Sequence, residues 1–128
     1  DANRPWQHVI EPLIGYILLT QKQISRKIND NACWNFGPNR NNFLKAEDIV
    51  NIFKKLINFN VKTSNTNKFN ETKILKLNNS KSLRKLKWVP KWNMDIVSKK
   101  VTEWNKLKKK KVNVRNICEM QVISYFKD

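Results

Sequence analysis

The sequence has 128 residues, 40% of them apolar, and a formal net charge of +16 at pH 7. This length sets a ceiling of one small domain, residues 1–128, and the apolar fraction excludes a disordered tail. No apolar run approaches the roughly 20 residues that a membrane-spanning helix needs, and the N-terminus has no secretory signal pattern. We therefore expect a single cytoplasmic domain without a membrane partner.

The positive charge raises the question of a nucleic-acid partner. Only five of the 26 basic residues are arginine, the side chain best suited to bidentate recognition of phosphates and guanine edges. The lysines are spread along the chain, and with 19 asparagines and 12 isoleucines they indicate the composition that AT-rich codons produce. We therefore interpret the charge as a lysine-rich surface and do not expect nucleic acid as the partner. A basic binding module that contacts nucleic acid is the alternative function.

The first half of the chain is predicted to contain two helices and one strand. Apolar residues recur near the 3.6-residue helical period over residues 11–28. Residues 32–36 are a short apolar and aromatic run that ends at Gly37-Pro38, which predicts a central strand followed by a break. A second helix is predicted over residues 45–59, with two acidic residues in its first turn, where the helix dipole favours them.

The middle of the chain is predicted to be less regular. Residues 60–70 are polar with little pattern, which indicates an exposed loop. Residues 73–77 are predicted to form a second strand, and a short helix is expected from Asn79 or Ser80 to about residue 86. Pro90 then requires an extended segment over residues 88–92, because it excludes its neighbour from the helical region.

Two further helices are predicted at the end of the chain. Asn93 is suited to capping a helix that ends in Lys108 to Lys111, where cations favour the dipole. Residues 114–126 have weaker periodicity and predict a last helix whose inward side chains are Ile117, Met120 and Phe126. The expected fold class is therefore α/β, mostly helical with short strands.

Several kinds of active site are excluded by the residues present. Two glycines are too few for a Rossmann GxGxxG or a Walker loop, and neither tyrosine is followed at the fourth position by lysine. The two cysteines and the single His8 have no metal-ligand spacing, so His8 is interpreted as a hydrogen-bonded structural residue. We therefore expect no metal site and no catalytic residue in this chain.

Three segments carry a resemblance to a known family. Residues 4–16 (RPWQHVIEPLIGY), residues 34–38 (WNFGP) and residues 71–92 resemble, in this order, motifs of CDP-glucose 4,6-dehydratases, which are extended short-chain dehydrogenases/reductases. The resemblance covers essentially the whole chain and about the last third of such an enzyme. The family pattern is not kept at Asn70, just before the third segment, nor at Thr72, Asn78 and Lys87 within it.

The resemblance implies that this chain is the C-terminal substrate-binding lobe of a longer enzyme, inactive alone. The intact enzyme would bind NAD in an N-terminal Rossmann domain that is missing here. It would convert CDP-glucose to CDP-4-keto-6-deoxyglucose and water, a step in deoxysugar and lipopolysaccharide biosynthesis. The implied partners are the CDP-sugar and the enzyme's own Rossmann domain, and homo-oligomerisation is left open.

The resemblance also implies four substrate-binding residues. The arginine at the position of Arg4 reaches the diphosphate in related enzymes, and a guanidinium can grip phosphate oxygens bidentately. Trp6 and Gln7 are expected to line the same nucleotide cleft, and packing in the core is the alternative for Trp6. Glu71 matches a glutamate of the third motif and is expected to meet the nucleotide.

Overall fold

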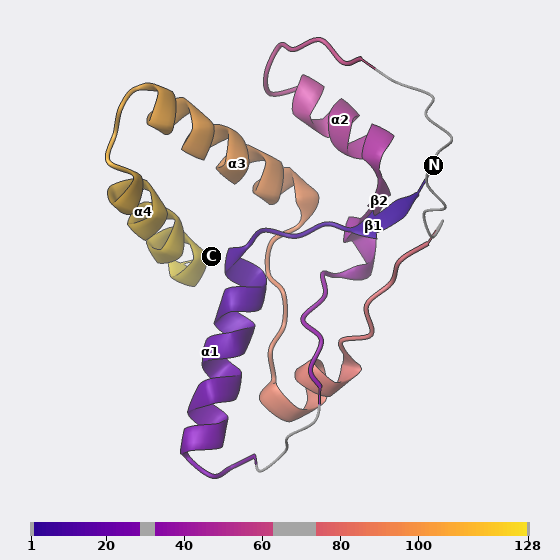
Figure 1. The fold of residues 1–128 in the computed structure, drawn as a ribbon, viewed down its shortest axis with the longest axis vertical. Helices are drawn as coiled ribbons and strands as arrows, with labels where there is room; N and C mark the ends of the chain where they lie inside the picture. Colours follow the sequence, from indigo (N-terminus) through magenta and orange to yellow (C-terminus); the bar gives the residue numbers. More distant parts are fainter. Residues whose placement is uncertain (1, 29–32, 63–73, 128) are drawn as a thin grey trace.

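The computed structural model describes residues 2–28, 33–62 and 74–127. The described chain is mostly helical with one two-stranded sheet, so the α/β class holds in this coarse form (Figure 1). The elements in chain order are β1 (Asn3–Pro5), α1 (Ile10–Ile24), the 3₁₀ turn η1 (Arg40–Asn42), β2 (Phe43–Lys45), α2 (Ala46–Lys54), the π turn η2 (Ser82–Leu86), α3 (Met94–Lys109) and α4 (Val114–Lys127).

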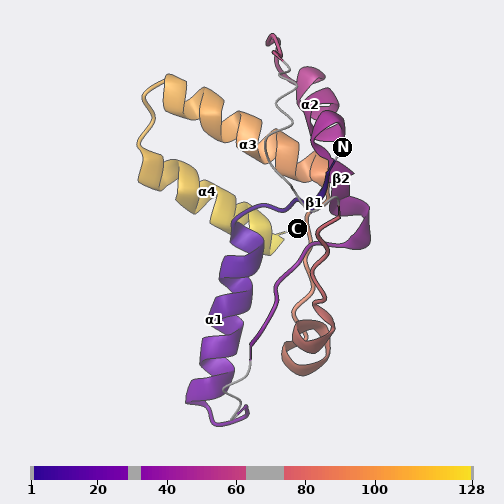
Figure 2. The ribbon, with the colours of Figure 1, turned by 45° about the vertical axis from the view of Figure 1, so that its right-hand side comes forward.

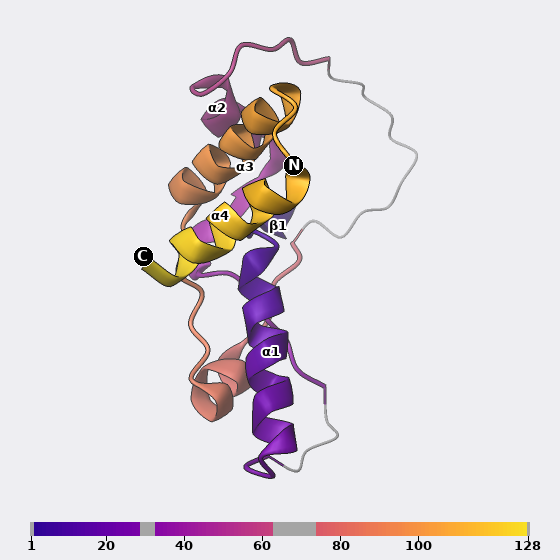
Figure 3. The same cartoon turned by 90° about the vertical axis from the view of Figure 1, so that its left-hand side faces the viewer.

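The helices form two groups, one of α2, α3 and α4 and the other of α1 and η2, which meet at the N-terminal end of α1. α3 and α4 run side by side as a hairpin, and the C-terminal end of α4 lies at the N-terminal end of α1 (Figures 2 and 3). η2 packs against α1, and α2 packs against α3 and β2. None of the described helices is long and apolar enough to cross a membrane.

Two three-residue strands tie the N-terminal segment to the middle of the chain. β1 and β2 pair antiparallel, with Arg4 opposite Leu44 and Pro5 opposite Phe43, and Asn3 also bridges Ile74 in parallel. Strands this short carry no detectable period-two pattern, and Pro5 removes one backbone donor. The sheet therefore could not be predicted from the sequence.

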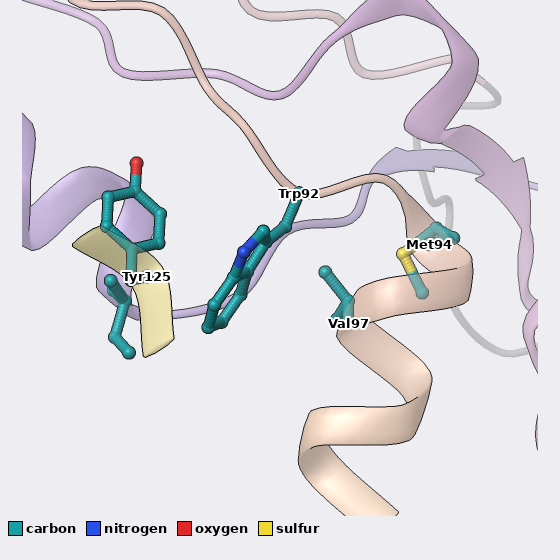
Figure 4. Close-up of a cluster of buried hydrophobic side chains, with 5 residues drawn as sticks. Trp92, Met94, Val97 and Tyr125 are labelled. Carbon is teal, nitrogen blue, oxygen red and sulfur yellow. The ribbon is translucent and has the colours of Figure 1, made fainter. Parts of the chain in front are cut away.

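The core consists of two apolar clusters joined by α1. The first contains five buried residues, of which Figure 4 shows Trp92 between Tyr125 and Val97. The second is built on Phe36, Leu86 and Trp88. Ile14 packs against both clusters, so α1 connects them.

The helix predictions are confirmed in position, and α1 and α2 end earlier than predicted. α1 ends at Ile24 because Arg26 adopts a left-handed φ of 54° and Lys27 N–H donates to the Lys22 carbonyl, a Schellman-type ending. α2 ends at Lys54 rather than near residue 59. The cap of α3 is as predicted, because the Asn93 side chain accepts a 3.0 Å hydrogen bond from Ile96 N–H.

The predicted strand over residues 32–36 is wrong in its described part. Residues 33–39 have no regular structure, because side chains rather than a neighbouring strand bind their carbonyls. In the predicted strand over residues 73–77 only Ile74 forms a bridge, and Lys73 lies outside the described residues. Most of the predicted loop over residues 60–70 also lies outside them.

The inward face of α4 differs from the prediction. Ile117 is fully buried as expected, but Met120 and Phe126 are 52% and 64% exposed. Gln121 and Tyr125 are buried in their place. Both make polar contacts inside the molecule, Gln121 with the Lys100 carbonyl and Tyr125 with Glu11. Hydrogen bonding therefore determines which face of α4 is buried more than the spacing of its apolar residues does.

Candidate functional site

The three motif segments, far apart in the sequence, are held together by hydrogen bonds. The Gln7 amide donates to the Phe36 carbonyl at 2.8 Å, which joins the first motif to the second. The Asn79 amide donates to the Gly37 carbonyl at 3.0 Å, and the Ser82 hydroxyl donates to the Asn35 carbonyl. The irregular segment of residues 34–38 is thus fixed between the N-terminal segment and the third motif.

Gly15 allows the second motif to pack on α1. A Cβ atom at Gly15 would lie 2.2 Å from Cδ1 of Phe36, far inside van der Waals contact. The Phe36 ring instead fills this space and meets the ring of Trp88 edge to face, with centroids 5.1 Å apart. The glycine of the first motif is therefore a packing requirement.

Glu11 is a buried carboxylate that connects the first motif to the third. It is 0% exposed, and its Oε1 accepts hydrogen bonds from the backbone N–H groups of Lys91 at 2.9 Å and Trp92 at 2.7 Å. Its backbone carbonyl accepts a hydrogen bond from the Trp88 indole at 3.1 Å. Because a buried charge is tolerated only when it is well bonded, Glu11 determines the path of the segment around Pro90.

Tyr125 completes the bonding of this carboxylate from α4. Its hydroxyl donates to Oε2 of Glu11 at 2.7 Å. Burial raises the pKa of Tyr125, and the hydrogen bond and the charge of Glu11 raise it further. Tyr125 therefore remains a neutral donor to Glu11.

His8 is a buried structural histidine, in agreement with the sequence interpretation. Its Nδ1 accepts a hydrogen bond from Ile10 N–H at 3.3 Å, and its ring meets Trp92 edge to face at 5.0 Å. Burial lowers the pKa of His8, and the positive charge of Lys100 lowers it further. A neutral imidazole in this position supports packing.

The residues predicted to bind substrate occupy one continuous segment, with one exception. Arg4 is half-buried in β1, where its guanidinium donates to the Asn3 carbonyl at 3.0 Å. The Trp6 indole donates to the Leu44 carbonyl at 3.0 Å and packs on the first core cluster. Gln7 bonds to Phe36, as described above. Glu71 lies outside the described residues.

A cleft of about 680 Å³ lies beside this segment. Its lining combines apolar and polar side chains: Pro38, Phe43, Lys76, Leu77, Asn78, Asn79 and Ser80. Phe43 pairs with Pro5, whereas Arg4 pairs with Leu44, and alternation along a strand places these two pairs on opposite faces. The cleft therefore adjoins the Arg4 strand without Arg4 lining it.

The residues that line the cleft include groups suited to binding, but no set of acid, base and nucleophile groups that would act together in catalysis. Lys76 offers a cation, and the amides and hydroxyl of the residues that follow it offer donors and acceptors. Among the lining residues there is no carboxylate, imidazole or thiol. Across the described residues, no three histidine, cysteine or acidic side chains gather to hold a metal ion. The arrangement is suited to holding a polar ligand.

Sequence reasoning missed the residues that join the motifs, namely Glu11, Asn79, Ser82 and Tyr125. A signal existed only for Glu11, a single acid inside the apolar first turn of a predicted helix. Such an acid is well placed for the helix dipole whether it is exposed or buried. Its burial could not be distinguished without the segments that cover it.

Comparison with known proteins supports the motif resemblance. No family model matches the chain. The chain is 33% identical over 105 residues to a protein of Salmonella typhimurium described as CDP-glucose 4,6-dehydratase. The match covers 80% of this chain and 29% of that protein, in its C-terminal part. The resemblance indicated by the motifs is confirmed at this level.

Proposed function

We propose that this chain is the C-terminal, substrate-binding part of a CDP-glucose 4,6-dehydratase and works together with an NAD-binding Rossmann domain. The observation that carries the proposal is the joining of the three resembling motifs beside one cleft, which residues of the second and third motifs line in part. The similarity to the Salmonella protein supports the family, and the chain spans 29% of the length of that relative. In such an enzyme CDP-glucose is converted to CDP-4-keto-6-deoxyglucose and water in the cytoplasm.

The diphosphate of the sugar nucleotide is assigned to Arg4. Its backbone is fixed by the pairing with Leu44, and binding involves a turn of the guanidinium from the Asn3 carbonyl toward phosphate oxygens. Trp6 and Gln7 follow on the same segment and are assigned to the nucleotide side. Glu71 remains in the proposal through the resemblance alone.

Because Arg4 and the cleft lie on opposite faces of the short strand pair, we assign the rest of the ligand to the cleft, with the ligand passing around the strands. Its amides and its hydroxyl are suited to the hydroxyl groups of a sugar, and Lys76 adds a positive charge. Gly37 permits this geometry, because a Cβ atom there would lie 2.8 Å from Cβ of Leu77. The polar segment of the third motif can thus approach the second motif closely.

The described residues do not fit NAD. A pyrophosphate needs a glycine-rich turn at a helix N-terminus, and both glycines of this chain are used for close packing with negative φ. NAD would supply hydride transfer from the Rossmann domain. This chain would contribute binding and closure over the substrate.

The surface of α1 supports packing against such a domain. Val9, Leu13, Tyr16 and Ile17 lie on one stripe at helical spacing, and each is 47–63% exposed. An apolar stripe of this length on a helix that already buries its opposite side indicates a second packing partner. We assign the α1 stripe to the Rossmann domain.

The experiment is a calorimetric titration of the chain with CDP-glucose. Arg4→Gln is expected to weaken binding by about tenfold or more, because a charge-assisted hydrogen bond to phosphate contributes about 1.5–3 kcal/mol. The matched control is Arg115→Gln, which removes an exposed arginine from α4. A second titration uses duplex DNA over a range of salt concentrations. Steeply salt-dependent DNA binding without CDP-glucose binding would establish the basic-module alternative instead.

A further inference from the structure

We propose that the groove between α2 and α3 is a second binding site, which accepts a small organic anion with an apolar body. The groove consists of two adjoining hollows of about 580 and 660 Å³ that share Leu56, Thr102 and Lys106. It is lined by other residues than the cleft at residues 76–80. The site therefore stands independently of the proposed dehydratase function.

The floor of the groove is apolar. It is formed by side chains of α2, the segment after it and α3, namely Phe53, Leu56, Ile57, Phe59, Ile96 and Leu107. Two of these side chains are aromatic and partly exposed, so they offer flat surface to a ring or an acyl chain. A ligand that is only an inorganic ion would leave this surface unused.

The rim of the groove is cationic. Lys99, Lys106, Lys109 and Lys110 line it, with Glu103 as the one acid among the lining residues. Lys100 also lines it, but its ammonium donates to the Ser124 hydroxyl at 2.7 Å on the side of α4. Among the described residues, none of the four rim lysines has a carboxylate partner within salt-bridge distance. The rim thus has a positive charge that a ligand can neutralise.

Thr102 adds a polar group under the point where the hollows meet. It is 6% exposed, and its hydroxyl has no hydrogen-bond partner among the described residues. A threonine inside a helix commonly donates to the carbonyl four residues earlier, and this one does not. Thr102 lines both hollows, so a ligand oxygen in the groove can supply the missing partner of its hydroxyl.

The helix dipole places the acid group within the groove. The C-terminal end of α3 carries partial negative charge, which disfavours an anion next to Lys109 and Lys110. Thr102 lies about two turns before the end of α3, and Lys106, which begins the last turn, is one turn from Thr102. We therefore assign the acid group to Thr102 and Lys106 and the apolar body to the floor near Leu56.

The test uses three probes with ¹⁵N-labelled chain: phenyl phosphate, benzyl alcohol and inorganic phosphate. Phenyl phosphate is expected to shift the amides around Thr102 and Lys106 at concentrations at least fivefold below the other two. Lys106→Gln and Thr102→Val are each expected to weaken phenyl phosphate binding about fivefold. The matched control, Lys85→Gln in η2, is expected to leave it unchanged.

The other outcomes each overturn the proposal. Equal binding of benzyl alcohol would show an apolar hollow without anion recognition, and equal binding of inorganic phosphate would show that the floor is unused. An equal effect of Lys85→Gln would show general charge attraction, which salt screens. Because CDP-glucose affinity should not change in Lys106→Gln, failure of this site leaves the proposed function untouched.

Discussion

The hydroxyl of Tyr125 donates a 2.7 Å hydrogen bond to the buried carboxylate of Glu11, 114 positions earlier in the chain. This contact joins the last helix to the first, at the carboxylate that also holds the backbone of Lys91 and Trp92. The closure of the first core cluster therefore depends on one polar network as well as on apolar burial.

Tyr125→Phe tests this network by removing a single oxygen atom, the hydroxyl that bonds to Glu11. The variant leaves Oε2 of Glu11 buried without its donor, which is expected to lower the free energy of unfolding by about 1–3 kcal/mol. Urea unfolding followed by tryptophan fluorescence measures the change. Tyr16→Phe is the matched control, because the Tyr16 ring is 53% exposed. Equal losses in the two variants would contradict the assigned role of Glu11.

The raised pKa of Tyr125 predicts a loss of stability at alkaline pH. The unfolded chain releases this proton near pH 10, whereas the folded chain retains it to higher pH because burial and Glu11 disfavour the phenolate. Above pH 10 the unfolded state therefore binds fewer protons than the folded state, and stability falls as pH rises. Unfolding curves at pH 8 to 11 should show this fall, and Tyr125→Phe should show less of it.

His8 provides a second pH prediction. Its pKa is lowered by burial and by Lys100, so the unfolded state takes up a proton below about pH 6.5 before the folded state does. Stability is present above pH 6.5 and is expected to decrease as pH falls from there toward the folded pKa. Because His8 is the only histidine, its proton resonances give the titration directly. A midpoint at or above 6.5 would be inconsistent with the buried geometry.

Lys100→Met extends the histidine prediction. Removing the ammonium is expected to raise the pKa of His8 part of the way toward its ordinary value, with burial still holding it down. The comparison variant is Lys22→Met, in the last turn of α1. An unchanged His8 titration in Lys100→Met would assign the whole shift to burial.

Gly15→Ala tests the packing of the second motif on α1. Alanine is favoured over glycine in helices by about 1 kcal/mol, yet the added methyl would collide with the Phe36 ring. We expect a net loss of about 1–3 kcal/mol in stability, as in other overpacked cores. The double variant Gly15→Ala with Phe36→Leu should recover part of that loss. Additive losses would show that the two residues do not share this space.

The helices could be predicted because their signals are local. The apolar spacing of α1 and α3 and the Asn93 cap lie within a few residues of the structure they specify. The rotation of α4 could not be predicted, because it depends on Glu11 far away in the sequence. Phe126 is more apolar than Tyr125, and only the buried carboxylate reverses their order of burial.

The segments that form the site could be predicted from the sequence, but their arrangement in space could not. The motif resemblance identified the segment that contains Arg4 and Gln7. The structure shows this segment joined to residues 34–38, which are joined in turn to residues 79–82. The irregular path of residues 33–36 could not be read from their apolar composition, since its hydrogen bonds come from distant side chains. The three-residue strands that orient Arg4 were likewise below detection.

The most direct test is to map where CDP-glucose binds on the ¹⁵N-labelled chain. The account predicts that amide shifts gather at residues 4–7 and 76–80, the strand segment and the adjoining cleft, and that Arg4→Gln reduces them. Shifts confined to the α2–α3 groove, or no shifts at any ligand concentration, would contradict the assignment of this chain as the substrate-binding part of a dehydratase.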